Sequence, residues 1–172
     1  DATKRVYLVK FNYNGHTFSR YANSGQGVHG GLPTAQELLG AGYNPKLTYA
    51  LNFGDFTATT PVTADKSVDV TVTVSGTFDI ASKDDWKVFC DIVNNGVTRV
   101  DAKLMNDVDL SEKITMAGTI RNYNGTFDGQ GHTLTLNWNS QSGEVAPFKF
   151  VNNATIKNLR VNGKIKSDGR TL

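Results

Sequence analysis

The sequence predicts a mainly β protein, in which a small module of short strands precedes an amphipathic helix and a set of stacked parallel coils. Three observations favour this fold class. Glycine is abundant, at 17 residues, and proline is scarce, at 4, which is typical of short strands joined by tight turns. Apolar and polar residues alternate along the first half of the chain. In the second half, pairs of apolar residues recur about every 26 residues, which indicates a repeat architecture.

Charge and length exclude several classes of partner. The 172 residues include 18 Lys and Arg against 16 Asp and Glu, and both signs are scattered along the chain. We expect no nucleic-acid partner, because no basic patch could follow a phosphate backbone. No apolar run approaches the ~20 residues that span a bilayer, so we expect no membrane insertion by this segment. The single cysteine, Cys90, cannot form an internal disulfide and is expected to be a buried thiol.

The first half begins with a predicted hairpin. Residues 5–14 (RVYLVKFNYN) alternate with a period close to two, which predicts a half-buried strand. Asn14 and Gly15 form a strong turn signal, so a second strand is expected over residues 16–23.

A short helix and two further strands are expected after a glycine-rich loop. The helix is predicted within residues 33–43 (PTAQELLGAGY), with Thr34 near its start and Gly40 or Gly42 at its end. LTYALNF (47–53) predicts one strand, and SVDVTVTVSG (67–76) predicts another. The second of these places one row of valines on a dry face: Val68, Val70, Val72 and Val74.

These features, in this order, resemble a known module. KFNYNGHTF, LPTAQELLGAGY and FGDFTATTPVTADKSVDVTV are similar to the Listeria and Bacteroides surface repeat, the InlB B-repeat family, over about residues 5–75. The resemblance implies a β-grasp-like domain at residues 1–76 that acts as a spacer or interaction module on a bacterial surface. The family has a Gly-Trp pair shortly after its Gly-Tyr, which this chain lacks, so we expect the central packing to differ.

The second half opens with an amphipathic helix. Ser82 is a predicted N-terminal cap, and Asn95 with Gly96 predicts the end of the helix. The spacing i, i+3, i+4 and i+7 places one apolar stripe on this helix. The stripe consists of Trp86, Phe89, Cys90 and Val93.

A weak internal repeat follows the helix. It aligns Val108 with Leu134 at a spacing of 26 residues, and Leu134 with Leu159 at a spacing of 25. Because one coil cannot bury its apolar face alone, we expect successive coils to stack through parallel strands. The helix is expected to plug the first open end of this stack.

The repeat carries a second resemblance, over about residues 78–166. SKDDWKVFCDIVNNG, AKLMNDVDLS, GTFDGQGHTLTL and NATIKNLRVNGKI look like the opening coils of right-handed β-helix surface proteins of gut bacteria, related to the GLUG repeat. The resemblance implies a domain at residues 77–172 with a cap helix, the first coils of a right-handed parallel β-helix, and further coils beyond Leu172.

The stretch NGTFDGQGHTLTL contains the most suggestive pair of chemical groups, Asp128 and His132. As a turn, it would use Gly125, Gly129 and Gly131 at positive φ, with the Asp128 carboxylate accepting hydrogen bonds from turn amides. As a site, the pair would serve as base and acid or as two metal ligands. We expect the turn, and hence no catalytic residue, metal or cofactor, because no third convergent group is evident. Asp107 and Asp109 in NDVDL are likewise interpreted as a solvated strand face rather than a calcium site.

Aromatic residues provide the candidate ligand-binding residues. Trp138 is followed by a polar loop and Tyr123 precedes a turn, so an exposed ring could stack on a sugar with help from Arg121 or Asn137. The alternative is that Trp138 covers the coil below it.

The function we expect is adhesion or display. The segment is interpreted as part of a secreted or cell-surface bacterial protein that binds a host or environmental glycan or protein without catalysis. One alternative is a polysaccharide lyase or hydrolase fragment, since right-handed β-helices also house such enzymes. Another is a purely structural spacer. An unpaired edge at the last coil would also favour self-association through residues 145–166, or a cap donated from elsewhere.

Overall fold

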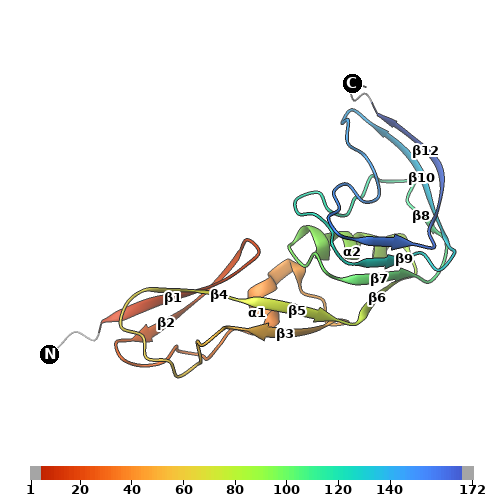
Figure 1. Ribbon diagram of the computed structural model, residues 1–172. Coiled ribbons are helices and arrows are strands. Elements are labelled where there is room, and N and C mark those ends of the chain that lie inside the picture. The colour runs from red at the N-terminus through yellow and green to blue at the C-terminus, as the bar shows by residue number, and fades with distance from the viewer. Residues whose placement is uncertain (1–4, 168–172) are drawn as a thin grey trace. The chain divides into compact units, whose positions relative to one another are not determined.

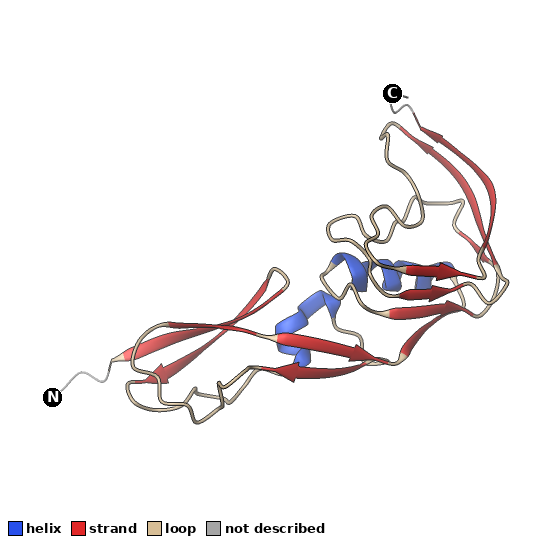
Figure 2. Ribbon diagram, viewed as in Figure 1, coloured by secondary structure: helices blue, strands red, loops and turns tan. Residues whose placement is uncertain are grey.

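The computed structural model describes residues 5–167 and is mainly β, with 42% strand and 12% helix (Figures 1 and 2). The mainly β class predicted from the sequence is confirmed. The chain divides into two compact units. The first unit comprises Asp1–Tyr43 and Tyr49–Thr73, and the second comprises Asn44–Thr48 and Val74–Leu172. The predicted domain ends at residues 1 and 172, and the expectation of further coils, lie outside the described residues.

The first unit opens with the predicted hairpin. Strand β1 (Val6–Tyr13) pairs antiparallel with β2 (His16–Asn23), and Tyr13 faces His16 across the turn. Asn14 has φ 44° and Gly15 has φ 89°. Two successive positive φ angles are what a two-residue hairpin turn requires, so the local Asn-Gly signal determines this reversal.

A capped helical turn and a parallel strand complete this part of the first unit. Helix α1 (Ala35–Leu39) begins after Thr34, whose hydroxyl accepts a hydrogen bond from Glu37 N, and ends at Gly40 with φ 52°. A short 3-10 helix, η1 (Gly40–Gly42), follows it. Strand β4 (Lys66–Asp69) lies parallel to β1, giving the sheet order β2-β1-β4.

The single strand predicted over residues 67–76 is wrong, because the chain changes sheets within it. Strand β4 ends at Asp69, and β5 (Thr71–Ser75) pairs with β3 (Thr48–Asn52) in a separate two-stranded sheet. Val70 lies between them and donates its backbone N–H to Asn12 O at 2.8 Å. Val68, Val70 and Val72 are all buried, so the alternation of side chains continues through the break and conceals it in the sequence.

Phe11 is central to the core of the first unit. It is fully buried, and its ring meets the rings of Phe53 and Phe56 edge-on, with centroids 5.7 Å apart in both pairs. Such edge-to-face contacts stabilise aromatic pairs beyond their buried area. Aromatic packing around β1 therefore holds this unit together.

The helix of the second unit forms as predicted. Helix α2 (Lys83–Asn94) begins after Ser82, whose hydroxyl accepts a hydrogen bond from Asp85 N, and ends at Asn95. The next residue, Gly96, has φ 97°, and Cys90 is buried as expected. Within residues 5–167 no helix has both the length and the apolar character needed to cross a membrane.

Two parallel sheets follow each other along the second unit (Figure 1). The four-stranded sheet has the order β11-β9-β7-β6 and the three-stranded sheet the order β12-β10-β8. All the strand pairs described in these sheets are parallel. The strands are β6 (Thr77–Ile80), β7 (Asp101–Leu104), β8 (Val108–Asp109), β9 (Thr126–Asp128), β10 (Thr133–Ser140), β11 (Thr155–Lys157) and β12 (Arg160–Ser167).

The predicted alignment of the repeat is half right. Leu134 pairs with Val108, as expected from the 26-residue spacing. On its other side Leu134 pairs with Val161 and not with Leu159. A shift of two residues leaves every side chain on the same face of a strand, so the apolar pattern alone could not distinguish these registers.

An aromatic cluster joins α2 to the sheets. Trp86 and Phe89 are fully buried on the helix, and both rings contact Phe127 of β9 and Phe148, with centroids 5.6 to 6.2 Å apart. Full burial of a large apolar side chain stabilises the fold by about 1.5–3 kcal/mol. The predicted apolar stripe of α2 therefore covers the interior side of the four-stranded sheet.

Two of the three glycines in residues 124–136 do not have the positive φ angle that was expected of them. Gly131 has the predicted positive φ, at 79°, and Gln130 shares it at 52°, but Gly125 and Gly129 are not among the residues with positive φ. A Cβ at Gly125 would lie 2.3 Å from Val100 O, and one at Gly129 would lie 2.5 Å from Asn158 O. These two glycines are needed because backbone from a distant part of the sequence passes against them, a constraint that appears only in the folded structure.

We expect Gly129→Ala to destabilise the second unit by about 1–3 kcal/mol, because the added methyl meets backbone atoms that cannot move aside cheaply. The measurement is urea unfolding followed by tryptophan fluorescence, which reports on this unit alone, since Trp86 and Trp138 are the two tryptophans of the chain. Gly131→Asn is the matched control, because a Cβ there meets nothing within 4 Å and Asn tolerates positive φ. Equal stability of the Gly129→Ala and parent proteins would contradict the packing role.

Candidate functional site

The two aromatic candidates for ligand binding are buried. Trp138 is 2% exposed and donates its indole N–H to Leu110 O at 2.6 Å, while Tyr123 is 0% exposed and donates its hydroxyl to Val100 O at 3.0 Å. Burial raises the pKa of the Tyr123 hydroxyl. The expectation of an exposed ring that stacks on a sugar is therefore wrong, and Trp138 instead packs inside the second unit, against the segment that contains Leu110.

The two polar candidates for ligand binding, Asn137 and Arg121, do not flank an exposed aromatic ring. Asn137 is exposed on the outward face of β10, where it pairs with Lys164 of β12. Arg121 is half-buried in the loop before β9. Neither residue lies beside an exposed face of Trp138 or Tyr123, so the four residues do not form a sugar-stacking platform.

Asp128 and His132 bond to different partners. Asp128 Oδ1 accepts hydrogen bonds from Gln130 N at 2.9 Å and Asn158 Nδ2 at 3.0 Å. His132 Nδ1 lies 3.3 Å from Asp107 Oδ1, in the segment between β7 and β8. The hydrogen bonds from Gln130 and then Asn158 hold the pKa of Asp128 below its usual range, with Lys157 adding to the effect. The predicted turn role of the Asp128 carboxylate is confirmed.

The other acidic pair is also engaged in local structure. Asp107 Oδ1 accepts the backbone N–H of Thr133 at 2.8 Å, and Asp109 Oδ1 accepts that of Ser111 at 2.8 Å. The bonds from Ser111 lower the pKa of Asp109. Over residues 5–167 no group of three or more His, Cys, Asp and Glu side chains is placed to hold a metal ion.

A column of alternating charge crosses the outward face of the four-stranded sheet. The strand registers place four residues side by side, one from each of β6, β7, β9 and β11. Lys103 Nζ lies 3.5 Å from Asp79 Oδ1, and Lys157 Nζ lies 3.5 Å from Asp128 Oδ2. We name Asp79, Lys103, Asp128 and Lys157 the charge column.

A second polar row runs beside the charge column. Thr77 pairs with Asp101, Asp101 lies beside Thr126 on β9, and Thr126 pairs with Thr155. The Asp101 carboxylate accepts the backbone N–H of Thr126 at 2.7 Å. The two rows meet in a shallow depression whose lining consists of Thr77, Asp101, Ala102, Lys103, Thr126, Asp128, Gln130 and Lys157.

This outward face is the candidate site, and sequence reasoning missed it. Its signal lay in four short segments, TFD, DAK, TFD and TIK, each with a polar or charged residue on both sides of an apolar one. The segments become one surface only when their registers are known. Exposed ion pairs contribute little to folding stability, so these groups can exchange a neighbour for a ligand at low cost.

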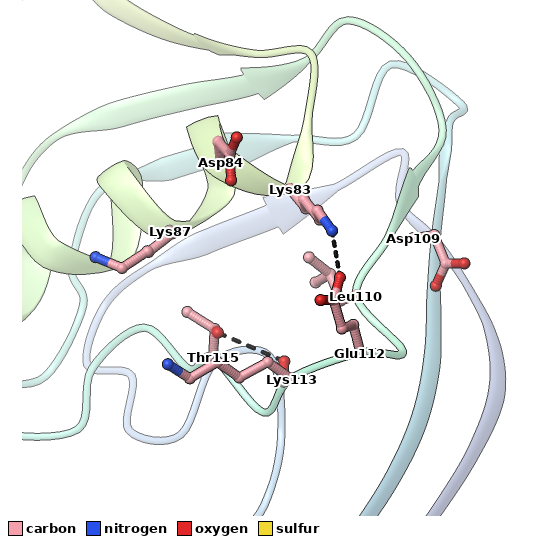
Figure 3. A pocket seen from close by; sticks show the side chains of 8 residues that line it. All are labelled: Lys83, Asp84, Lys87, Asp109, Leu110, Glu112, Lys113 and Thr115. Atoms are coloured by element: carbon pink, nitrogen blue, oxygen red, sulfur yellow. Dashed lines mark hydrogen bonds and ion pairs between the residues drawn. The ribbon is translucent and has the colours of Figure 1, made fainter.

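A second hollow lies between α2 and the loop after β8 (Figure 3). Its main contact is the ion pair of Lys83 with Glu112, which raises the pKa of Lys83 and lowers that of Glu112. Opposite charges alternate around the hollow and neutralise one another, so it selects for neither anions nor cations. The lining is Lys83, Asp84, Lys87, Asp109, Leu110, Glu112, Lys113 and Thr115.

Comparisons with protein-family models, with curated proteins and with solved structures gave no match to this chain.

We expect Asp128→Asn to weaken the pH dependence of stability. A carboxyl whose folded-state pKa is lowered contributes stability above the ordinary carboxyl pKa of about 3.9, and this is lost as the pH falls through the folded-state value. The parent protein should therefore lose more of its urea midpoint than the variant between about pH 6 and about pH 2. Tryptophan fluorescence at each pH provides the measurement, and losses of equal size in the two proteins would contradict the assignment.

Proposed function

We propose that this chain is a non-catalytic binding segment of a secreted or cell-surface bacterial protein, which engages a glycan or a protein surface through the outward face of its four-stranded sheet. The observation that carries the proposal is the in-register array of hydroxyl, carboxylate and ammonium groups formed by the charge column and the row beside it. The architecture we propose is a β-grasp-like module followed by a cap helix and the first coils of a right-handed parallel β-helix.

The order of the strands supports the β-helix proposal. From β7 onward the chain passes from the four-stranded to the three-stranded sheet three times, as β7 then β8, β9 then β10, and β11 then β12, with a loop after each of the first two passages. The loops also meet in parallel, through the bridges of Ala117 with Phe148 and of Tyr123 with Val151. A strand, a crossover and a parallel strand, as in β6, α2 and β7, form a right-handed connection in about 98% of cases.

The first unit is consistent with a β-grasp-like module. Its sheet combines a β1–β2 hairpin with β4 parallel to β1, and helix α1 contacts both strands of the hairpin. The relation to a surface repeat rests on the quoted motifs of residues 5–75.

The binding mechanism we propose depends on rigidity. Each strand of the outward face is hydrogen-bonded to its neighbours, so the backbone that carries these side chains is already ordered and loses little further entropy when a ligand binds. Asp, Lys, Thr and Gln side chains supply both donors and acceptors, which suits the hydroxyl groups of a sugar or the polar rim of a protein. Shallow contacts repeated along such a face would combine into useful avidity.

We expect the protein to be retained on an immobilised glycan without converting it. The measurement is a comparison of pectin, heparin and host-type glycans for retention, for new reducing ends and for unsaturated products. Thr77→Ala/Lys103→Ala should weaken retention by about thirtyfold, since the double variant loses two hydrogen bonds that contribute roughly 1 kcal/mol each. The matched control is Lys10→Ala/Ser19→Ala, which removes the same kinds of group from exposed positions of β1 and β2.

Turnover of any of these glycans would reject the non-catalytic proposal. Retention that is equal in the Thr77→Ala/Lys103→Ala variant and the control variant would reject the outward face as the site.

A further inference from the structure

Strand β4 of the first unit has one unpaired side. It lies parallel to β1 and is the last strand in the order β2-β1-β4 (Figure 1). Val70, just after β4, donates its N–H to Asn12 O of β1. Because successive residues of a strand alternate in direction, the N–H and C=O groups of Ser67 and Asp69 point away from β1. Within residues 5–167 these groups have no backbone partner, so they are a template for a further strand.

A groove of about 360 Å³ runs along this unpaired side of β4. All four residues of β4 line one wall, and the other wall consists of Phe53, Asp55, Phe56 and Thr60. The side of the strand where a partner would pair is therefore open over the whole length of β4.

The inward row of the sheet leads to the aromatic wall of the groove. Phe11 of β1 pairs with Val68 of β4, and the two residues are 0% and 6% exposed. Phe53 is half-buried, contacts the Phe11 ring edge-on and lines the groove together with Val68. An apolar residue on an added strand, placed next to Val68 in this row, would cover the exposed part of Phe53.

Lys66 and Asp69 carry opposite charges at the two ends of β4. Side chains alternate along a strand, so Lys66 lies on the same face as Val68, and Asp69 lies on the face of Ser67. Lys66 Nζ lies 5.6 Å from the centroid of the Phe56 ring, at the groove. Neither Lys66 nor Asp69 forms an ion pair with a residue of the range 5–167. Both charges are therefore available to a cross-strand partner.

We propose that β4 binds an extended segment of a second, different protein, which adds to the β2-β1-β4 sheet as an antiparallel strand. Antiparallel pairing is slightly more stable per residue than parallel pairing. From its N-terminal end, the segment places a basic residue opposite Asp69 and an apolar residue opposite Val68. A polar residue then lies opposite Ser67 and an acidic residue opposite Lys66. Backbone hydrogen bonds supply affinity and the alternate side chains supply selectivity, as in other complexes formed by strand addition.

A second copy of this chain fits the unpaired side of β4 less well. Directly opposed residues of two antiparallel strands lie on the same face, so Lys66 of one copy would lie opposite Val68 or Val70 of the other. The ammonium group would then have an apolar neighbour and no carboxylate. The complementary partner is therefore a segment of a different protein.

The test uses the complete chain and two fluorescent peptides of equal composition. The matched peptide is Ser-Gly-Lys-Val-Thr-Glu-Gly-Ser, and the exchanged peptide is Ser-Gly-Glu-Val-Thr-Lys-Gly-Ser. We expect fluorescence anisotropy to show that the matched peptide binds at least about tenfold more tightly, because two charge pairs change from attraction to repulsion in the exchanged peptide.

Backbone methylation separates strand pairing from attraction between charges. The threonine N–H of the matched peptide faces Ser67 O, whereas its valine N–H points away from β4. N-methylation of the threonine should weaken binding by about fivefold, which is the effect of one hydrogen bond. N-methylation of the valine is the matched control and should leave the affinity unchanged.

A charge swap on the chain tests the position of the segment. Lys66 and Asp69 are exposed, so Lys66→Glu/Asp69→Lys should keep the circular dichroism of the parent while preferring the exchanged peptide. Failure of the parent chain to bind the matched peptide, or equal binding of the two peptides, would overturn the proposal. Equal effects of the two methylations would also overturn it, in favour of simple charge attraction. A parent chain that sediments as a dimer, which the matched peptide does not dissociate, would overturn it in favour of a second copy.

This inference and the proposed function fail separately. Glycan retention depends on Thr77 and Lys103 of the second unit, whereas peptide binding depends on β4 of the first unit. The Lys66→Glu/Asp69→Lys variant should keep its glycan retention, and the Thr77→Ala/Lys103→Ala variant should keep its preference for the matched peptide.

Discussion

The second unit depends on one constraint, the parallel register that places Phe78, Ala102 and Phe127 in one inward row. Side chains alternate between the two faces of a strand, so the register that buries this row also presents the charge column on the other face. A slip of one residue would exchange the two faces entirely. The hydrophobic interior and the candidate binding surface are thus two consequences of the same set of backbone hydrogen bonds.

The strands keep this register although the segments that connect paired strands differ in length. Phe78 and Ala102 are 24 residues apart with α2 between them, while Phe127 and Ile156 are 29 residues apart with a longer loop. Carboxylates from distant segments help to fix where a strand begins, as when Asp107 accepts the N–H of Thr133, the first residue of β10. Acidic residues that could be mistaken for catalytic groups in the sequence therefore link segments that lie far apart along the chain. The differences in length fall in the loops, outside the sheets.

The features that were predicted correctly from the sequence are those that depend on residues close together along the chain. The hairpin at Asn14 and the Ser82 cap of α2 each depend on residues within a few positions, and both form as expected. The predictions that failed concern contacts between residues far apart in the sequence. Trp138 was expected to be exposed because a polar loop follows it, yet the carbonyl that accepts its N–H belongs to Leu110, 28 residues earlier in the chain. The charge column could not be recognised either, because its four members are brought together only by the registers of four strands.

Apolar burial contributes more than charge to the register of the strands, but charge opposes one slip that burial allows. Burial of a large apolar side chain contributes about 1.5–3 kcal/mol, against roughly 0.2–1 kcal/mol for a cross-strand charge pair, so the apolar rows decide whether the strands pair. Burial cannot oppose a slip of two residues, because such a slip keeps every apolar residue facing inward. In the four-stranded sheet that slip would separate Lys157 from Asp128. In the three-stranded sheet it would move Gly163 away from Leu136 O and bring a residue with a Cβ to that place, although a Cβ at Gly163 would lie only 1.8 Å from this oxygen. An ion pair in one sheet and a glycine in the other therefore oppose the two-residue slip that the apolar pattern permits.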